Sequence, residues 1–504
     1  MPPPGLPETP GSATRQQPFF SAMHEMNIFQ LIKKETALLA DKIAVVEGEK
    51  TISYGQLVAQ VEHAARTLKS KGIQRFHRVG FICPNSIDYI LVSLAVLSLD
   101  AVIVPLSPEH TQEEIEDVVH QMDTEFVITT PGAYQARNSE PLELDGLHRL
   151  DIIRHESQRQ LPQEYYDINP AFIRFSSGTT GDSKGVALSH ESIMERTDLA
   201  GEGMRITSAD NIGWILSMSF HFVVTILLFL RRGATIAILN HPFEESLIAA
   251  MQKMKLTVLY ASPFHYDVFT KSAVITRESF GSVRLAISTA IKLPQEIYHG
   301  FKEKFGFKLT EAYGIIEVGL PFIAAGEDYL DDATLGPPLP GYQVAIHQPD
   351  ESGVGEILLK GKGMLDAYFH PWRGRRQALT DGWFNTGDLG RLDDTGALTI
   401  VGRKKNVINF AGMKVFPEEV ESVINQHPQV VESMVYGEPH GRFGHLPVAW
   451  VVARDGHGEK LDVEDLRTHC YRRLARYKAP KSFEVVSDIP KTKSGKIIRR
   501  WNHG

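Results

Sequence analysis

Apolar and polar positions alternate in blocks along most of the chain. Short apolar runs that suit buried strands, such as Arg78–Cys83 and Ala101–Leu106, flank the amphipathic stretch Ile87–Leu99, which suits a helix. The pattern continues in further strand-like runs: Phe126–Thr129, Phe172–Phe175, Thr235–Leu239, Val258–Tyr260 and Val283–Ser288. Strands that alternate with helices predict an α/β fold built from layered sheets.

The pattern changes twice in the C-terminal half. Between Thr334 and Arg403, short strands separated by Gly and Pro predict a small antiparallel or β-barrel-like unit. A helix–strand pattern then resumes and predicts a small α+β domain, with elements over Glu418–Gln426, Val430–Tyr436, Val448–Val452, Val463–Ala475 and Phe483–Val486. A chain of 504 residues is too long for one core. We expect a flexible tail over residues 1–22, a large N-terminal domain over 23–403 and a small C-terminal domain over 404–504.

The stretch Ile212–Leu230 is apolar enough to suggest a membrane-spanning helix, and two arginines follow it. Ser217, Ser219, His221 and Thr225 interrupt it, however, and an ionisable residue at the centre of a span is costly. We therefore predict a buried helix with a polar edge that faces a pocket, and no integral membrane span.

Charge and cysteine content narrow the choice of partner and compartment. The net charge of −8 is spread along the chain, and the one basic stretch, Lys491–Arg500, lies at the C-terminal end, so a nucleic-acid partner is not expected. The two cysteines, Cys83 and Cys470, cannot build a disulfide framework and lie in no CxxC pair. Ordinary thiols of this kind predict a reducing, cytoplasmic location.

A Gly- and Ser-rich segment follows the predicted strand that ends at Phe175. It runs from Ser176 to Val186 with the sequence SSGTTGDSKGV. Its glycines allow the backbone to approach an anion, its hydroxyl groups can donate hydrogen bonds, and Lys184 adds a positive charge. The spacing is not that of a Walker loop. The segment predicts a nucleotide-phosphate site made by Ser176, Ser177, Gly178, Thr179, Thr180, Gly181 and Lys184.

The order of further motifs resembles that of the acyl-adenylate-forming superfamily, which includes acyl-CoA and aryl-CoA synthetases. The resemblance covers about Ile28 to Arg499 and includes Thr51–Leu57, Asp100–Pro108, Ala312–Gly319, Asp381–Leu392, Val401–Glu421 and Pro490–Arg500. Asp100 stands where the family usually has glycine. The resemblance implies an AMP-forming acid–thiol ligase that uses ATP, Mg²⁺ and either CoA or the phosphopantetheine of a carrier protein.

The resemblance also assigns roles in the adenylate site. Tyr313, followed by Gly314, is implied to stack on adenine, Glu317 to hold Mg²⁺, Asp388 to accept hydrogen bonds from the ribose hydroxyls, and Arg403 to contact ribose or phosphate. Catalytic roles are implied for Thr180, His221, Glu317 and Lys496. Lys496 would stabilise the charge that develops between the carboxylate and the α-phosphate.

Two positions near this site depart from the family pattern. Ile316 replaces the usual Thr before Glu317, so a hydroxyl contact to the α-phosphate is missing. Ile291 is bulkier than the alanine expected near the adenine and acyl pockets, which predicts an acyl pocket of different shape.

In relatives the small domain rotates about a hinge between an adenylate-forming and a thiol-accepting pose. The resemblance places that hinge at Lys405, and it places Gly412 in the wall of the tunnel for the pantetheine arm. Without the resemblance, the basic run that contains Lys496 would be interpreted as a solvated tail, and Lys405 as an exposed linker lysine.

The acyl pocket is expected around the segment Ser219–Val224. The segment Trp214–Leu230 contains no Asp, which disfavours a free α-amino acid. His221 and Val224, together with Ile291, predict an apolar pocket for an aliphatic or simple aromatic acid. His221 could equally be a core histidine.

Three functions are therefore considered. The first is a ligase that activates a small-molecule carboxylic acid and transfers it to CoA. The second is an enzyme that loads an acyl or β-amino acid group onto a separate carrier protein. The third, a degenerate nucleotide-binding scaffold, is disfavoured because Lys184, Glu317, Asp388, Arg403 and Lys496 are all present.

Overall fold

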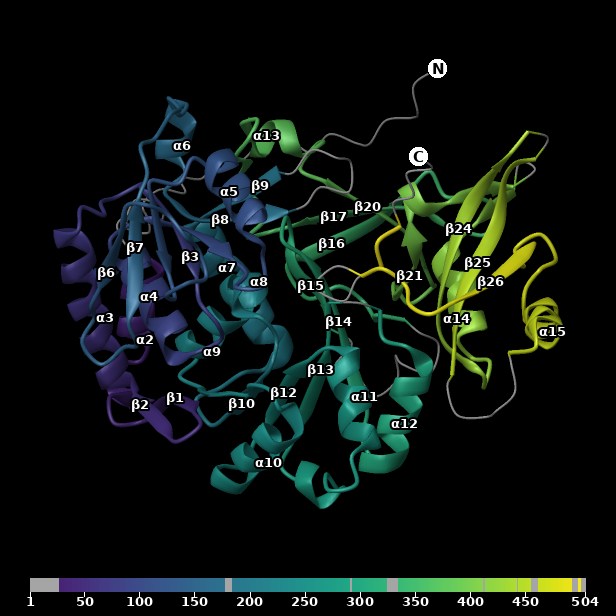
Figure 1. The fold of residues 1–504 in the computed structure, drawn as a ribbon, viewed down its shortest axis with the longest axis horizontal. Coiled ribbons are helices and arrows are strands. Elements are labelled where there is room, and N and C mark those ends of the chain that lie inside the picture. The colour runs from purple at the N-terminus through teal and green to yellow at the C-terminus, as the bar shows by residue number, and fades with distance from the viewer. Residues whose placement is uncertain are drawn as a thin grey trace, which may run out of the picture.

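The computed structural model describes residues 27–176, 184–290, 292–323, 334–410, 413–441, 443–454, 461–491 and 497–499. Figure 1 shows a large α/β unit and, beside it, a smaller unit formed by the C-terminal part of the chain. Within the described ranges the strands form four sheets, two in the core of the large unit, one in its third, smaller part and one in the small unit. This arrangement confirms the predicted α/β fold class.

The first large sheet has nine strands and carries the predicted phosphate loop. In spatial order it contains β19 (Arg373–Gly374), β18 (Ala367–Tyr368), β9 (Lys184–Ser189), β8 (Pro170–Ser176), β4 (Val102–Leu106), β3 (Arg78–Ile82), β5 (Phe126–Thr129), β7 (Leu150–Arg154) and β6 (Ser139–Leu142). The central strands β8, β4, β3 and β5 are parallel, while β9 returns antiparallel to β8. Every residue of β3 and β4 is buried, as expected of parallel strands covered on both faces.

The second large sheet has eight strands. Its order is β15 (Gly319–Ile323), β14 (Leu309–Ile315), β13 (Leu285–Ser288), β12 (Val258–Ala261), β10 (Asn211–Trp214), β11 (Thr235–Ile238), β1 (Ile43–Glu47) and β2 (Lys50–Ser53). The strands from β14 to β1 are parallel, and the two edge strands pair antiparallel. The edge strand β15 and its neighbour β14 bring the Tyr313–Glu317 segment to one side of this sheet (Figure 1).

Two smaller sheets follow. The segment predicted to be barrel-like contains the four antiparallel strands β16 (Tyr342–His347), β17 (Gly355–Gly361), β20 (Phe384–Leu392) and β21 (Leu398–Arg403). The small unit contains β22 (Ile408–Phe410), β23 (Met413–Val415), β24 (Val430–His440), β25 (Gly444–Ala453) and β26 (Ser482–Val486). The short 3₁₀ turn η4 (Lys404–Asn406) connects β21 to β22. The division of the chain at residue 403 stays a prediction.

Helices cover the sheets. In the large unit they are α2 (Ile28–Glu35), α3 (Tyr54–Ser70), α4 (Ile87–Ser98), α5 (Gln112–Gln121), α6 (Gln163–Asp167), α7 (His190–Met204), α8 (Met218–His221), α9 (Leu227–Arg231), α10 (Phe243–Lys253), α11 (Pro263–Lys271), α12 (Gln295–Phe305) and α13 (Arg375–Ala378), with the short turns η1 (Ala37–Leu39) and η3 (Glu278–Phe280). The small unit has α14 (Pro417–Ile424) and α15 (Val463–Arg473). Ser86 caps α4 by accepting from the amide of Tyr89, and nearly the whole of α4 is buried.

The apolar stretch Ile212–Leu230 is not the single helix that was predicted. It begins with the last residues of β10, continues through α8 and the π-helical turn η2 (Phe222–Ile226), and ends in α9. The β-branched and aromatic residues of Ile212–Trp214 complete a parallel sheet, and this tertiary pairing overrides the helical pattern. The prediction of burial is confirmed. Among the helices described, none has both the length and the apolar character needed to cross a membrane.

Candidate active site

The two ends of the predicted phosphate loop lie opposite each other on neighbouring strands. Ser176 ends β8, Lys184 begins β9, and the two residues are partners in the antiparallel register. The loop residues Ser177, Gly178, Thr179, Thr180 and Gly181 lie outside the described residues, and of Ser176 only the backbone is described. The ammonium of Lys184 lies 5.4 Å from the ring centroid of Tyr368 on β18. The strand predicted before the loop is therefore present as β8, and the loop itself stays a prediction.

Glu317 lies against the same tyrosine. The Tyr368 hydroxyl donates to Glu317 Oε1 at 3.4 Å, and the backbone carbonyl of Glu317 accepts from the amide of Leu365 at 2.7 Å. Arg373 contacts the same ring, with its guanidinium carbon 5.0 Å from the Tyr368 ring centroid. Lys184 and Glu317, which are far apart in sequence, thus meet around one aromatic ring.

A buried arginine holds the turn that carries Glu317. Arg196 on α7 is fully buried and donates from Nη1 to the carbonyl of Ile316 at 3.1 Å and from Nε to the carbonyl of Gly363 at 2.9 Å. Burial lowers its pKa to about 10, so it remains charged at neutral pH. Sequence reasoning missed Arg196, because an isolated arginine on an amphipathic helix carries no local signal of this contact.

Three strands bring together the residues predicted to hold the nucleoside. Asp388 on β20 and Arg403 on β21 are register partners, and Arg403 Nε lies 2.5 Å from Asp388 Oδ1. The hydroxyl of Tyr313, on β14, donates to Asp388 Oδ2. Burial, and then the charge of Asp388, raise the pKa of Tyr313 well above its usual value, so the phenol stays protonated and can donate.

Asp388 is buried, and each of its two oxygens has one of these donors. The two oxygens of a carboxylate together offer about four lone-pair sites, a set of acceptors that suits the two hydroxyl groups of a diol. The predicted ribose contact is compatible with this geometry.

Gly314, next to Tyr313, lies where only glycine fits. A Cβ placed there would meet the carbonyl oxygen of Gly319 at 2.4 Å and the Leu320 Cα at 3.2 Å. The close approach of β15 to β14 therefore requires a glycine beside the tyrosine.

The residues predicted to line the acyl pocket lie on α8 and η2. Phe220, His221 and Val224 are partly exposed, whereas Phe222 and Val223 between them are buried. The ring of His221 packs edge-on against Trp214, with centroids 6.0 Å apart. Ile291 lies outside the described residues. The π-helical turn shifts which side chains face outward, and such turns are frequent at functional sites.

Two non-glycine residues in or beside the resembled motifs have a positive φ. Asp100, at the position where glycine is usual, has a φ of 54°, and its side chain accepts from Asn27 Nδ2 at 2.8 Å. Ala290, beside Ile291, has a φ of 78°. Both lie in the left-handed region that favours glycine, and the aspartate is the more tolerant of the two residue types there.

Two family models match the chain. One, described as "AMP-binding enzyme", matches residues 33–369, and a second, described as "AMP-binding enzyme C-terminal domain", matches residues 419–496. The chain belongs to the AMP-binding enzymes. This confirms the resemblance to the acyl-adenylate-forming superfamily and the prediction of an AMP-forming acid–thiol ligase.

Individual AMP-binding enzymes resemble the chain over nearly its whole length. A probable CoA ligase of Humulus lupulus is 27% identical over 93% of this chain and 94% of its own. The 4-chlorobenzoate–CoA ligase of Arthrobacter is 26% identical, with 94% of each chain covered. The ATP-bound structure of MatB from Rhodopseudomonas palustris superposes with a TM-score of 0.79 at 26% identity, covering 94% of this chain and 97% of the other.

Three further predicted positions of this AMP-binding enzyme follow β21 in the chain. Lys405 is the middle residue of η4 and lines a pocket of about 420 Å³ together with Asn406, Tyr436, His445 and others. Gly412 and Lys496 lie outside the described residues. Both cysteines are buried, and burial raises the pKa of Cys83 to about 12 and that of Cys470 to about 11, which fits the predicted ordinary thiols.

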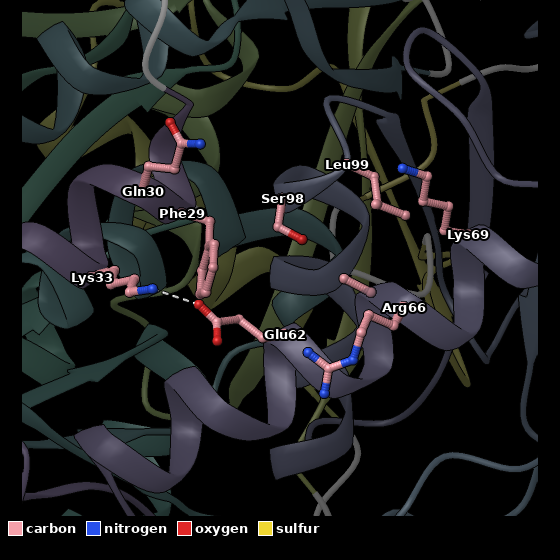
Figure 2. Close-up of a pocket in the computed structure, with 9 residues that line it drawn as sticks. Phe29, Gln30, Lys33, Glu62, Arg66, Lys69, Ser98 and Leu99 are labelled. Atoms are coloured by element: carbon pink, nitrogen blue, oxygen red, sulfur yellow. Dashed lines mark hydrogen bonds and ion pairs between the residues drawn. The ribbon is translucent and has the colours of Figure 1, made fainter.

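A further pocket of about 340 Å³ lies away from all these residues. Figure 2 shows it among α2, α3 and the end of α4, where Lys33 and Glu62 form an ion pair at 2.6 Å. Neither this pocket nor the one at Lys405 is lined by Lys184, Glu317 or Asp388.

Proposed function

We propose that this AMP-binding enzyme converts a carboxylic acid to its acyl-adenylate with release of pyrophosphate, and then transfers the acyl group to the thiol of CoA. The observation that carries the proposal is the position of β14. This strand and the turn after it place Tyr313 in the Asp388–Arg403 cluster and Glu317 beside Tyr368 and Lys184. The nucleoside and phosphate groups of one ATP molecule would then bind side by side.

Each cluster fits the part of ATP assigned to it. Asp388 would accept from the ribose hydroxyls while Tyr313 and Arg403 hold its carboxylate in place. Lys184 would bind the phosphates, along with the hydroxyl and amide donors of the preceding loop. Arg196 would fix the turn at Ile316, whose side chain offers no hydroxyl to the α-phosphate.

Glu317 is the residue proposed to hold Mg²⁺. Within the described ranges, no group of three or more His, Cys, Asp or Glu residues could enclose a metal ion. Mg²⁺ is commonly held by one or two carboxylates together with substrate phosphates, and a single carboxylate beside the phosphate loop fits that mode. When bound, the ion supplies charge neutralisation to the phosphate oxygens.

The chemistry needs no protein nucleophile. The substrate carboxylate attacks the α-phosphate and pyrophosphate leaves; the thiol then attacks the mixed anhydride and AMP leaves. Lys496 is proposed to stabilise the charge that develops in the first step, and His221 and Val224 to border the acyl group. An apolar border of this kind suits an aliphatic or simple aromatic acid.

The role of Lys496 is testable by separating the half-reactions. Lys496→Ala should lower acid-dependent ATP–pyrophosphate exchange by at least ~10²-fold, the scale of losing one preorganised electrostatic contact. Thioester formation from synthetic acyl-adenylate should remain. Lys491→Ala, which removes a lysine paired with Glu432 on the same domain, is the control and should affect neither reaction. Equal loss of both half-reactions in Lys496→Ala would overturn the assignment.

CoA is proposed as the acceptor because the relatives named above are CoA ligases, whereas a phosphopantetheinyl carrier protein is the alternative. Gly412→Leu should block transfer to either thiol and spare adenylation. Transfer rates to CoA and to a holo-carrier protein, measured at equal thiol concentration, decide between the two. Loading of the carrier without formation of acyl-CoA would replace the CoA proposal with the carrier-loading function.

A further inference from the structure

An arginine of intermediate exposure lies beside the segment proposed to border the acyl group. Arg174, on β8, donates from Nη1 to the carbonyl of Phe220 at 2.9 Å, and its guanidinium carbon lies 5.2 Å from the Phe220 ring centroid. Phe220 is one of the partly exposed residues of α8, next to His221. The arginine therefore belongs to the wall formed by Phe220, His221 and Val224.

The charge of Arg174 is not neutralised by any ion pair within the described residues. Its Nε is shielded from solvent and has no hydrogen-bond acceptor there, and Glu317 acts on it only through a longer-range attraction. Burial lowers the pKa of Arg174 to about 10, which still leaves it protonated at neutral pH. A charge that is partly withdrawn from water loses solvation, and an opposite charge would offset that loss. By contrast, Arg78, a buried arginine of the same nine-stranded sheet, pairs with Asp123 and Glu125, both at 2.9 Å.

The sheet register sets the distance between Arg174 and Tyr368, the residue that contacts Lys184 and Glu317. Arg174 pairs with Val186, and Val186 pairs with Tyr368, so the three side chains lie on one face of β8, β9 and β18. Two strand spacings amount to roughly 10 Å. Tyr368 contacts Glu317 and Lys184, which are proposed to bind the phosphates and their Mg²⁺. Arg174 contacts Phe220, which lies in the segment proposed to border the acyl group.

We propose that Arg174 binds a second acidic group on the substrate, so that the acid this enzyme activates is a short dicarboxylic acid. The inference rests on the proposed adenylating function. One carboxylate would react near Lys184 and Glu317, and the other would pair with the guanidinium, whose planar fork matches a carboxylate. A spacing of about two strands limits the acid to a short chain.

The test compares acids of equal chain length that carry one or two carboxylates. Acid-dependent ATP–pyrophosphate exchange is measured with malonate, succinate and glutarate against propionate, butyrate and valerate. The wild-type enzyme should prefer the matched dicarboxylate by at least ~10-fold in kcat/KM, the lower bound for a hydrogen bond to a charged group. In Arg174→Met, kcat/KM should fall by about 10- to 10²-fold for dicarboxylates and stay unchanged for monocarboxylates.

Two variants control for structural damage. Arg174→Lys keeps the charge without the fork and should fall between the wild type and Arg174→Met in its preference. Arg232→Met removes a partly buried arginine that pairs with Asp198 on α7, and it should not change the preference. Thermal unfolding reports whether each variant is folded.

Three results would overturn the proposal. The first is a wild-type preference for monocarboxylates, which decides the matter even if Arg174→Met does not fold. The second is an equal loss toward all acids in Arg174→Met, which would assign the arginine to the nucleotide or to the core. The third, exchange with none of these or other acids, would overturn the adenylating function itself.

Discussion

Arg499 and Glu421 form a bidentate ion pair, in which the two guanidinium Nη atoms donate to the two carboxylate oxygens at 2.5 and 2.6 Å. Glu421 on α14 is buried and also accepts from the amide of Val435 at 2.6 Å, while Arg499 donates to the Val435 carbonyl at 2.9 Å. The pair fastens the C-terminal segment to α14 and β24. Because Lys496 lies three residues earlier, this contact anchors the segment proposed to deliver the catalytic lysine.

Arg499→Met should lower the rate of adenylation by at least ~10-fold, because the segment that carries Lys496 loses its anchor. In a Lys496→Ala background the same substitution should lower the rate no further. It should also destabilise the small domain by about 3 kcal/mol, since it leaves the buried Glu421 unpaired. The double variant Glu421→Gln/Arg499→Met should recover stability but not exchange activity. Additive losses of Arg499→Met and Lys496→Ala would show that Arg499 does not act through the lysine.

The Asp388 cluster predicts a specific defect in ATP binding. Asp388→Asn keeps the shape of the side chain but removes the charge that Arg403 and Tyr313 contact, so the KM for ATP should rise by about 10- to 10²-fold. Tyr313→Phe keeps the ring and should raise the KM for ATP by less. Steady-state exchange at varied ATP measures both effects. An unaltered KM for ATP in Asp388→Asn would exclude the aspartate from the nucleotide site.

Glu311 on β14 predicts a pH dependence of stability. It is buried, accepts from the amide of Leu293 at 2.9 Å, and burial raises its pKa from the ordinary 4.5 to about 7. Between pH 4.5 and 7 the folded state therefore holds a proton that the unfolded state has lost, and stability falls as the pH rises through this window. Glu311→Gln, which keeps an acceptor for Leu293, should remove this loss.

The difference in stability between Glu311→Gln and wild type should be near zero around pH 4.5 and grow to at most about 3 kcal/mol by pH 8. Thermal unfolding at a series of pH values measures it. Glu303→Gln, at an exposed position of α12, is the control. Parallel pH profiles for Glu311→Gln and wild type would contradict an elevated pKa in the folded enzyme.

The hinge prediction gains support from the contacts on either side of Lys405. Lys404 forms an ion pair with Glu356 on β17, whereas Asn406 donates to Glu418 on α14 at 2.7 Å. Residue 404 thus contacts the large unit and residue 406 the small one, so the chain passes from one unit to the other at Lys405.

Lys405→Pro should preserve adenylate formation and slow thioester formation, because proline fixes one backbone dihedral. Lys405→Ala keeps the backbone freedom and serves as the control. Single-turnover measurements of the two half-reactions separate the effects. An unaltered rate of thioester formation in Lys405→Pro would place the pivot elsewhere.

Much of the fold could be predicted from local pattern. The runs around β3, β4, β5 and β11 are short, apolar and bounded by turn residues, and the structure places strands there within a residue or two. The pattern failed at Ile212–Leu230, where pairing with β11 and β12 turned the first residues into a strand. Such pairing is set by distant residues, which a sequence window does not contain.

The candidate site likewise contains residues that the sequence predicted and residues that it did not. Lys184 was predicted from the composition of its loop, and Tyr313, Glu317, Asp388 and Arg403 from the resemblance. The structure places them in two clusters that β14 and the turn after it connect. Arg174, Arg196 and Tyr368 were missed, because their roles depend on cross-strand register and on carbonyl groups far away in sequence. Arg174 in particular belonged to a run that predicted only a strand.

The most direct test of the central claim is the identity and ratio of the products. With ATP, CoA and an acid that supports exchange, the account predicts one AMP and one pyrophosphate for each acyl-CoA formed, as measured by separation of the nucleotides and the thioester. Release of ADP and phosphate, or release of AMP without a matching amount of thioester in the presence of CoA, would contradict it.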